Sequence, residues 1–255
     1  MKSPHFIRYN IPFFYQKTER EFRQDVYERY DEMVVRQTAL HLADELWEVY
    51  PFQPVLDWML KHLPKEENLK IVEVGCGVGR LIGSMAMAQK SNDYWGLDYS
   101  YQMLRRAFEY WKSQKDIDLD LSARGRSKIT LSRINVPSSL VNFGLAKGED
   151  LPFEKESVDV VCSSFLLDRL SDPMAGIKEQ YRVLKKGGKL LLITPLNFQK
   201  AKHWELFYPL DQFVKQIELV GFSINKINSE LIVDEPLDAH GNFIRWNCIG
   251  VSAEK

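Results

Sequence analysis

The 255-residue sequence has few cysteines, almost no net charge and no long apolar run, and each of these absences excludes a class of protein. The three cysteines, Cys76, Cys162 and Cys248, are far apart and form no CxxC pair, so neither a disulfide framework nor a metal site is indicated. A reducing cytoplasm is the simplest setting for such a chain. The formal net charge of -1 gives no global attraction to nucleic acid or to an anionic membrane. No window reaches the length of an apolar membrane span.

The first 64 residues are expected to form a helical segment that caps a second domain. From about Phe22 to Tyr50, apolar residues recur at steps of three and four, and Pro51 ends this pattern. Pro54 can start a second helix. The segment carries more aromatic rings than a solvated tail would, so we expect most of them to pack on the rest of the chain. Its first residues lack the apolar core and the cleavage site of a signal peptide.

Residues 65–255 alternate between short apolar runs and helical patterns, which is typical of parallel strands joined by crossover helices. Asp172 and Pro173 predict the start of one helix, and the glycines of KKGG predict its end. Gly221 predicts the end of the last helix. Two strand-like runs then follow with only PLDAHGN between them, which is too short for a crossover helix. One strand of the sheet must therefore run antiparallel.

The segment from Lys112 to Ser139 is long for a connection between a helix and a strand. We expect a short strand around Ile129–Ser132 within it. Acidic residues in its first half are followed by basic residues in its second half. The segment is therefore interpreted as a solvated excursion, with a substrate lid or an anion-contacting arm as the alternatives.

A glycine loop follows the first apolar run of residues 65–255. In VEVGCGVGR, Gly75, Gly77 and Gly79 stand two residues apart, between a strand and the start of a helix. Glycines allow positive φ angles and let a ligand approach the backbone closely. The spacing is GxGxG and not the GxGxxG of dinucleotide-binding loops. Glu73 precedes the loop, and a carboxylate there disfavours a pyrophosphate and suits a cationic ligand.

Asp98 ends the next strand-like run, nineteen residues after Gly79. An acid at the tip of the second strand can accept hydrogen bonds from the hydroxyls of a ribose. No GKS or GKT follows the glycine loop, so a phosphate-gripping P-loop is not indicated. A nucleoside that carries positive charge and no phosphate describes S-adenosylmethionine, which joins adenosine to a sulfonium and an ammonium group.

Four segments in this order resemble the Rossmann-like (class I) S-adenosylmethionine-dependent methyltransferases: VEVGCGVGR, GLDYSYQML, EDLPFEKESVDVVCSSFLLDRLSDP and YRVLKKGGKLLLITP. The resemblance extends from about Lys70 to the C-terminus. It implies an α/β fold with a mostly parallel seven-stranded sheet, helices on both faces and an antiparallel last strand. It also implies S-adenosylmethionine as cofactor and S-adenosylhomocysteine as product. The cofactor-binding residues that it implies are Glu73, Gly75, Cys76, Gly77, Gly79, Asp98, Tyr99, Met103, Gly148, Glu149, Ser163 and Ser164.

The chain departs from the family pattern at two places. Lys147 stands where relatives often have an Asp that meets the adenine amino group, so adenine recognition would rest on Gly148 and Glu149. Asp168 and Arg169 stand where relatives often carry a His, which argues against a His-based proton transfer at that point.

Candidate substrate contacts follow the fourth and fifth strands, where sheets of this kind place their substrates. His203 and Asp168 are the candidate general bases, and Trp204 and Tyr208 are the candidate walls of an apolar pocket. Each base candidate has a structural alternative. His203 can be a packing or surface residue of a short helix, and Asp168 can form an ion pair with Arg169 or cap a helix.

The sequence thus predicts a cytoplasmic methyltransferase that acts on a small molecule bound between the cap and the carboxyl ends of the strands. The aromatic content and the near-neutral charge favour a small acceptor, and the lack of a basic stripe disfavours RNA. The alternatives are a methyltransferase for RNA or protein, and a non-catalytic protein that binds S-adenosylmethionine or S-adenosylhomocysteine. The GxGxG spacing disfavours an NAD-dependent oxidoreductase.

Overall fold

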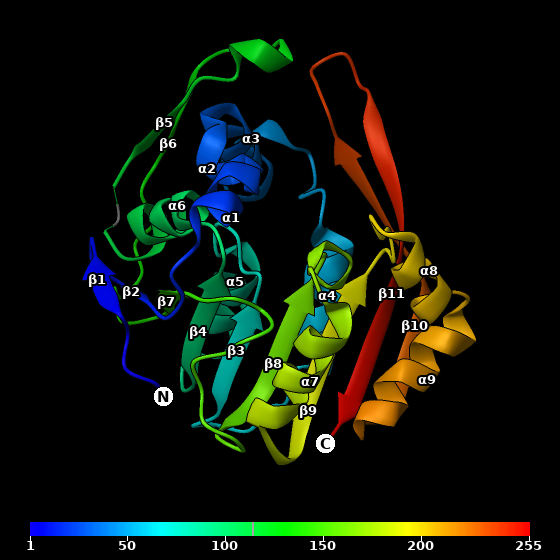
Figure 1. Cartoon of the computed structure of the whole chain (residues 1–255). Helices are drawn as coiled ribbons and strands as arrows, with labels where there is room; N and C mark the ends of the chain where they lie inside the picture. The colour runs from blue at the N-terminus through cyan, green and yellow to red at the C-terminus, as the bar shows by residue number, and fades with distance from the viewer. Residues whose placement is uncertain (114) are drawn as a thin grey trace.

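A nine-stranded sheet forms the centre of the computed structural model, which describes residues 1–113 and 115–255 (Figure 1). Six neighbouring strands run parallel, and β11 pairs antiparallel with both β9 and β10. In spatial order the strands are β1 (Phe6–Arg8), β2 (Ile11–Phe13), β7 (Asn142–Leu145), β4 (Asp93–Asp98), β3 (Lys70–Val74), β8 (Val158–Ser164), β9 (Leu184–Thr194), β11 (Phe243–Glu254) and β10 (Ser223–Pro236).

The mostly parallel sheet and its reversed strand confirm the sequence-based prediction, but the sheet is two strands wider than predicted. The extra strands, β1 and β2, come from the segment that was expected to be helical. Tyr9 and Asn10 have φ angles of 49° and 61°, which is the left-handed geometry of a tight hairpin turn. Phe13 then pairs in parallel with Leu145 and is buried, so the pair of strands extends the sheet beyond β7.

Helices cover both faces of the sheet, as predicted. One face carries α4 (Gln53–His62), α5 (Arg80–Ala88) and α6 (Tyr101–Trp111), and the other carries α7 (Pro173–Val183), α8 (Ala201–Phe207) and α9 (Leu210–Val220) (Figure 1). Successive strand residues point to opposite faces, so they divide between two hydrophobic cores. In β3, Ile71 belongs to the core under α4–α6, whereas Val72 and Val74 belong to the core under α7–α9.

Capping residues set several of the helix boundaries. The Asp172 side chain accepts a hydrogen bond from the Ala175 N–H at 3.0 Å, and Pro173 occupies the first turn of α7, as predicted. Gly221, with a φ of 116°, ends α9, as predicted. The prediction for KKGG was wrong, because α7 ends at Val183. Both glycines of KKGG lie inside β9, near an irregularity in its pairing with β8.

The long helix predicted from about Phe22 to Tyr50 is broken into shorter pieces. These are α1 (Glu19–Gln24), α2 (Val26–Arg29), α3 (Asp31–Leu42) and the 3-10 helix η1 (Asp44–Leu46). Asp25 interrupts the pattern because its side chain accepts the Tyr27 N–H at 2.9 Å and so caps α2. Thr18 and Glu21 form a capping box at the start of α1. We call α1–α3 the cap helices; in Figure 1 they lie beyond the carboxyl ends of β3 and β4.

Two long connections extend past the same edge of the sheet and meet above α3. The first, residues 115–139, contains the hairpin β5 (Ile117–Leu119) and β6 (Ile129–Leu131) and the 3-10 helix η2 (Ser122–Arg124); we call it the arm. The second is the β10–β11 turn, whose Ala239 N–H donates to the Arg124 carbonyl at 3.1 Å. The short strand predicted near Ile129 is confirmed, whereas residue 114 of the predicted excursion lies outside the described residues.

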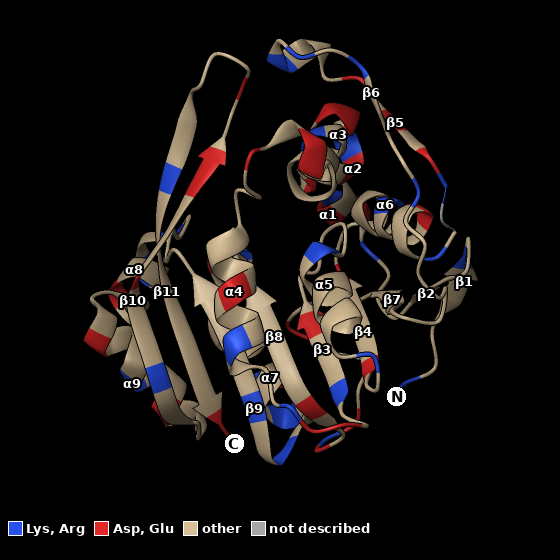
Figure 2. Cartoon of the chain, turned by 180° about the vertical axis from the view of Figure 1, so that it is seen from behind, with Lys and Arg blue, Asp and Glu red and all other residues tan. Residues whose placement is uncertain are grey.

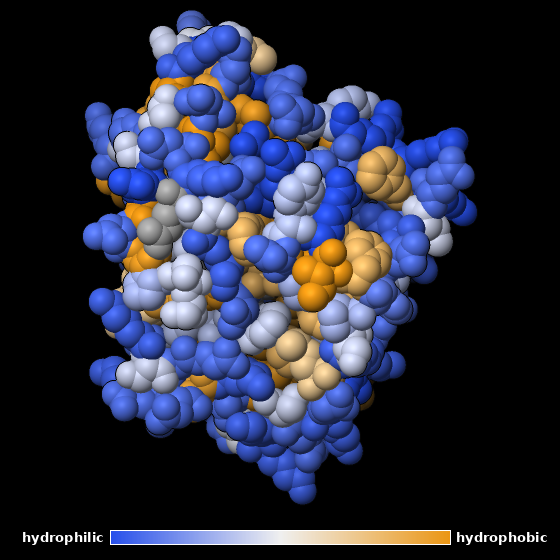
Figure 3. All heavy atoms as spheres, turned by 90° about the vertical axis from the view of Figure 1, so that its left-hand side faces the viewer, coloured by the Kyte–Doolittle hydropathy of each residue, from blue (hydrophilic) through white to orange (hydrophobic). Residues whose placement is uncertain are grey.

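Charged residues are mixed in sign over the surface. Figure 2 shows both signs on the cap helices and on the arm. The face that carries β1, the arm and α6 is mostly hydrophilic, with apolar side chains in small scattered groups (Figure 3). Among the described residues, none of the helices has the length and apolar character that crossing a bilayer requires.

Candidate functional site

The glycine loop joins β3 to α5 at the carboxyl edge of the sheet. Gly75, Gly77 and Gly79 have φ angles of 79°, 54° and 79°, which only glycine adopts without strain. The loop is also closely packed. A Cβ added at Gly75 would lie 3.1 Å from Leu166 Cδ1, and one added at Gly77 would lie 3.3 Å from the Met103 Cε. The glycines thus form a tight turn between β3 and α5, as predicted, with Leu166 and Met103 packed against it.

Asp98, the last residue of β4, is held against this loop. Its Oδ2 accepts the Gly77 N–H at 2.8 Å, and its Oδ1 accepts the Ser100 N–H at 2.8 Å. Burial raises the pKa of Asp98 to about 6, although the two N–H groups act in the opposite direction. Each carboxylate oxygen can accept more than one hydrogen bond, so Asp98 retains acceptor capacity for two hydroxyl groups of a ligand.

Glu73 lies beneath the glycine loop and is 2% exposed. Its Oε2 accepts the Ile82 N–H of α5 at 3.0 Å. Burial raises the pKa of Glu73 to about 8, and the nearby charge of Asp98 adds to the rise. In the absence of a cation, Glu73 therefore holds a proton at neutral pH. A cationic ligand next to it would favour the ionised form and lower this pKa.

The first residues of the cap close over the Tyr99 ring, a contact that the sequence did not reveal. Lys17 Nζ lies 4.2 Å from the centre of the Tyr99 ring, and the Tyr15 ring lies 5.9 Å from it. Tyr15 donates its hydroxyl to Glu21, and Glu21 also pairs with Lys147 at 3.3 Å. Glu21 of the cap is therefore the carboxylate that lies beside Lys147.

The other residues predicted near the adenine differ in their contacts. Met103 is buried against the glycine loop. Gly148 packs closely, because a Cβ there would lie 3.0 Å from Leu170 Cδ2. Glu149 uses its Oε1 to accept the Ser171 hydroxyl at 2.6 Å, so its carboxylate ties two loops together.

Two buried side-chain oxygens without hydrogen bonds belong to the end of β8 and to the segment that follows it. Among the described residues, the Ser163 Oγ and the Asp168 Oδ2 form no hydrogen bond, although both are buried. Asp168 lies in the 3-10 helix η3 (Leu167–Arg169), and its side chain is 0% exposed. Arg169 Nε approaches its Oδ2 at 3.4 Å, and Thr194 donates to its Oδ1 at 3.4 Å. Burial raises the pKa of Asp168. Buried polar atoms in this state suit a bound polar ligand.

Among the described residues, the side-chain ring contacts and hydrogen bonds of His203, Trp204 and Tyr208 are with one another and with Phe198, and none is with the glycine loop or Asp98. All three lie on or next to α8, around Phe198, in the layer formed by α7–α9. His203 is buried against Phe198, and Tyr208 is 60% exposed at the surface. The catalytic role of His203 and a substrate pocket walled by Trp204 and Tyr208 stay predictions from the sequence. Sequence order places α8 after β9, but it does not reveal which way the helix faces.

An aromatic cluster that the sequence analysis missed lies between the cap and the strand ends. Phe165 follows β8, and its ring meets that of Phe52 at 5.2 Å and that of Trp246 at 6.0 Å. The Trp246 Nε1–H donates to Glu235 at 2.8 Å, and Glu235 also accepts a hydrogen bond from Arg36 of α3. The long spacing between Phe52 and Trp246 in the sequence explains why no local pattern indicated this cluster.

His41 of α3 lies at the border of the same cluster. Its Nδ1 lies 2.7 Å from the Tyr50 hydroxyl oxygen, and its ring contacts that of Phe52 at 4.8 Å. Burial lowers the pKa of His41 to about 3, and the charges of Arg80 and Arg36 lower it further. His41 is therefore neutral over the physiological range and is a weak proton acceptor. Among the described residues, no group of His, Cys, Asp and Glu side chains could hold a metal ion.

Comparisons with known proteins agree with this geometry. Residues 72–192 match the family model described as "Methyltransferase domain". The chain is 29% identical over 133 residues to the ubiquinone/menaquinone biosynthesis C-methyltransferase UbiE of Geotalea daltonii, which covers 45% of this chain and 54% of the relative. It is also 29% identical over 175 residues to a demethylmenaquinone methyltransferase of Anoxybacillus flavithermus, which covers 67% of this chain and 65% of the relative.

The structural comparison supports the same fold. An S-adenosylmethionine-dependent methyltransferase from Mesorhizobium loti superimposes with a TM-score of 0.52 at 19% identity, over 80% of this chain and 98% of that chain. At this identity the likeness concerns the fold alone. The chain spans about half the length of the first curated relatives that it matches.

Proposed function

We propose that this chain, in which residues 72–192 form a Rossmann-like methyltransferase domain, transfers a methyl group from S-adenosylmethionine to a small molecule. The observation that carries the proposal is the glycine loop closed onto Asp98. The Gly77 N–H and the Asp98 carboxylate lie 2.8 Å apart at the strand ends, directly under the cap. We retain the division into a cap, residues 1–64, and a cofactor-binding domain, residues 65–255. Within the cap, β1 and β2 pair with the edge of the sheet, and α4 packs on one of its faces.

The charges and hydrogen-bonding groups at the strand ends would suit S-adenosylmethionine. Asp98 would bind the ribose hydroxyls, and the loop from Gly75 to Gly79 would receive the methionine part. Glu73, beneath that loop, would be the nearest carboxylate to its positive charge. Tyr99 and Met103 would lie against the adenine, with Gly148 and Glu149 near its edge. The unpartnered Ser163 Oγ, with Ser164 beside it, would border the amino-acid end.

The chain's own residues would mainly orient the reactants and accept a proton. The sulfonium supplies an activated methyl group, so the transfer requires alignment of the acceptor atom with the carbon–sulfur bond. Asp168 is the candidate proton acceptor because its Oδ2 is buried and free of hydrogen bonds among the described residues. Its raised pKa brings it closer to neutral pH, where a carboxylate is a more effective base. Arg169 and Thr194 would hold its orientation.

The proposed acceptor is a small aromatic molecule. Phe52, Phe165 and Trp246 supply rings beside the donor site, and stacking on such rings favours a planar ligand. The two relatives described above are named as methyltransferases of quinone biosynthesis, which supports a ring-shaped acceptor. A cytoplasmic location stays a prediction from the cysteine content.

The test is release of S-adenosylhomocysteine when the protein and S-adenosylmethionine are incubated with a small-molecule extract. At limiting S-adenosylmethionine we expect release by the wild-type chain and reduced release by Asp98→Asn, with Glu205→Gln on the exposed side of α8 as the matched control. A parallel incubation uses an extract that retains RNA and protein, and release only in that extract would replace the small-molecule acceptor with a macromolecule. Calorimetric binding of S-adenosylmethionine without release in any extract would show a cofactor-binding protein without turnover.

A further inference from the structure

Tyr27 of α2 has a hydroxyl group that the hydrogen bonds of the fold do not use. Its side chain is half-buried and packs on the hydrophobic core under α4–α6. Among the described residues, the Tyr27 hydroxyl forms no hydrogen bond. Tyr15, in the same cap, donates its hydroxyl to Glu21, and the Tyr30 hydroxyl accepts a hydrogen bond from Arg29 at 2.9 Å. The Tyr27 hydroxyl is therefore left to bind a ligand or solvent.

Helix α2 is fixed beside the strand ends by charged groups on both sides of its tyrosine. Glu28 accepts the Tyr101 N–H, at the start of α6, at 2.7 Å. Lys17 pairs with Asp25 at 2.7 Å and with Glu28 at 3.0 Å, and each of these three side chains is 7% exposed or less. Tyr101 follows Asp98 by three residues, so these bonds hold α2 next to the proposed ribose-binding position.

Charged groups from two parts of the site act on the Tyr27 hydroxyl. Asp98 belongs to the proposed donor site, and Arg169 lies next to the candidate proton acceptor. Arg36 and Glu235 form the ion pair beside the aromatic cluster. Burial raises the pKa of Tyr27, and these four charges alter it in both directions, which places the hydroxyl between the donor site and the cluster. The two positive and two negative charges cancel, so they favour a neutral ligand group over an ion.

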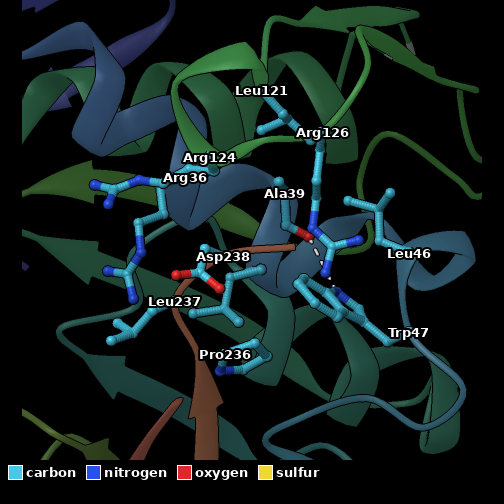
Figure 4. A pocket seen from close by; sticks show the side chains of 11 residues that line it. Arg36, Ala39, Leu46, Trp47, Leu121, Arg124, Arg126, Pro236, Leu237 and Asp238 are labelled. Atoms are coloured by element: carbon cyan, nitrogen blue, oxygen red, sulfur yellow. Dashed lines mark hydrogen bonds between the residues drawn. The ribbon is translucent and has the colours of Figure 1, made fainter. Parts of the chain in front are cut away.

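A pocket that Arg36 also lines is too small to compete for the ring of the acceptor. It lies between α3, the arm and the β10–β11 turn, and Trp47 and Arg126 form part of its wall (Figure 4). Its volume is about 30 Å³, which is close to the volume of one water molecule in the liquid. An aromatic acceptor therefore belongs beside the rings of Phe165 and Trp246, and not in this pocket.

We propose that Tyr27 donates a hydrogen bond to a neutral oxygen on the aromatic ring of the acceptor, as in a phenol. The inference rests on the proposed methyl transfer, because it assigns a contact of the same acceptor. The bond would orient the ring between the aromatic cluster and the donor methyl group. When Asp168 accepts the phenol proton, negative charge develops on the oxygen and strengthens the hydrogen bond from Tyr27. The cap thus selects an acceptor that carries a ring oxygen.

The first test uses p-cresol and p-xylene, a pair of probes in which a hydroxyl replaces a methyl group on the same ring. Binding to the full chain, saturated with S-adenosylhomocysteine, is measured by NMR titration. A site without a hydrogen-bond partner favours the more apolar p-xylene. We expect the wild type to favour p-cresol, and Tyr27→Phe to lower this preference about tenfold. Tyr30→Phe removes a hydroxyl from a 49% exposed side chain of the same cap and is expected to keep the preference.

A preference of the wild type for p-xylene, or a lack of binding of both probes, would overturn the proposal. So would equal changes in Tyr27→Phe and Tyr30→Phe. S-adenosylhomocysteine affinity is measured first for each variant, and unchanged values show that the fold is intact. A fall of that affinity in Tyr27→Phe alone would assign the hydroxyl to the cofactor and overturn the acceptor contact. A wild type that binds no S-adenosylhomocysteine would refute the proposed function, and the inference with it.

The second test measures turnover, as release of S-adenosylhomocysteine from S-adenosylmethionine in a small-molecule extract. We expect Tyr27→Phe to lower the rate about tenfold at low extract concentration and to leave the KM for S-adenosylmethionine unchanged, because the hydroxyl contacts the acceptor alone. Tyr30→Phe is expected to match the wild type. An unchanged rate in Tyr27→Phe, or a raised KM for S-adenosylmethionine, would overturn the acceptor contact. Absence of release by the wild type would instead count against methyl transfer itself.

Discussion

Replacing Glu73 by Gln is expected to stabilise the cofactor-free protein at neutral pH and to weaken its binding of S-adenosylmethionine. Glutamine has the shape of the protonated carboxyl and can still accept the Ile82 N–H. The substitution therefore removes the charge and keeps the hydrogen bond. Because Glu73 is 2% exposed, solvent screens its charge little.

The magnitude follows from the pKa of Glu73, which burial raises from 4.5 to about 8. Between these two pH values the folded state binds more protons than the unfolded state, so the free energy of unfolding falls as pH rises. From pH 4.5 to 7, about 2.5 units at roughly 1.4 kcal/mol per unit give a loss on the order of 3 kcal/mol. The Gln variant lacks this loss. Its melting temperature is expected to exceed that of the wild type by roughly 6 to 12 °C at pH 7 and to match it near pH 4.5.

The assay is thermal unfolding by circular dichroism from pH 5 to pH 8, together with calorimetry of ligand binding at pH 7.5. A ligand cation next to Glu73 would lose its partner in the variant, so we expect affinity for S-adenosylmethionine to fall by about tenfold or more. S-adenosylhomocysteine lacks the sulfonium charge and is expected to lose less. Glu205→Gln, an exposed change of the same type, is expected to leave the pH profile unchanged. If the melting temperatures of Glu73→Gln and the wild type changed equally with pH, the reasoning would be refuted.

Three further predictions test the packing of α5, the ribose-binding role of Asp98 and the proton-accepting role of Asp168. In an exposed helix, replacing Gly by Ala stabilises by about 1 kcal/mol. At Gly83 in α5, however, the added Cβ would lie 2.3 Å from the buried Trp111 ring, so we expect Gly83→Ala to lower the free energy of unfolding in urea by roughly 1–3 kcal/mol. A higher free energy of unfolding in the variant would contradict this packing. Asp98→Asn is expected to lower calorimetric affinity for both S-adenosylmethionine and S-adenosylhomocysteine by about tenfold or more, and an unchanged affinity would remove the ribose assignment. Asp168→Asn is expected to lower kcat, to leave S-adenosylhomocysteine affinity unchanged and to abolish the rise of rate with pH through the pKa of Asp168. A variant that keeps the wild-type pH–rate profile would exclude Asp168 as the base.

Local spacing was sufficient to predict the glycine loop and the position of Asp98. The three glycines are required by their own backbone angles, and Asp98 ends a strand that neighbours β3, so both features are encoded in short segments. The reversed β11 followed from the shortness of the turn before it. Features of this kind are determined by a few residues that are neighbours in the sequence, and they do not require contacts with distant parts of the chain.

The features that the sequence did not predict depend on tertiary placement. Lys147 departs from the family pattern, but nothing near it in sequence indicated that Glu21 of the cap would pair with it. His203 was a reasonable base by its position after β9, yet α8 turns it into the core against Phe198. The raised pKa of Glu73 arises from burial, which its motif alone does not reveal.

The attachment of the cap at both of its ends has a consequence for how the site opens. Phe13 and Phe14 are joined to Leu145 of β7, and α4 packs on the sheet, so the stretch from Tyr15 to Phe52 is tethered on either side. If α1–α3 separate from Tyr99, they reclose by an intramolecular step. The effective concentration of such a tethered segment is about millimolar. A cap peptide supplied as a separate molecule would have to reach that concentration to replace it.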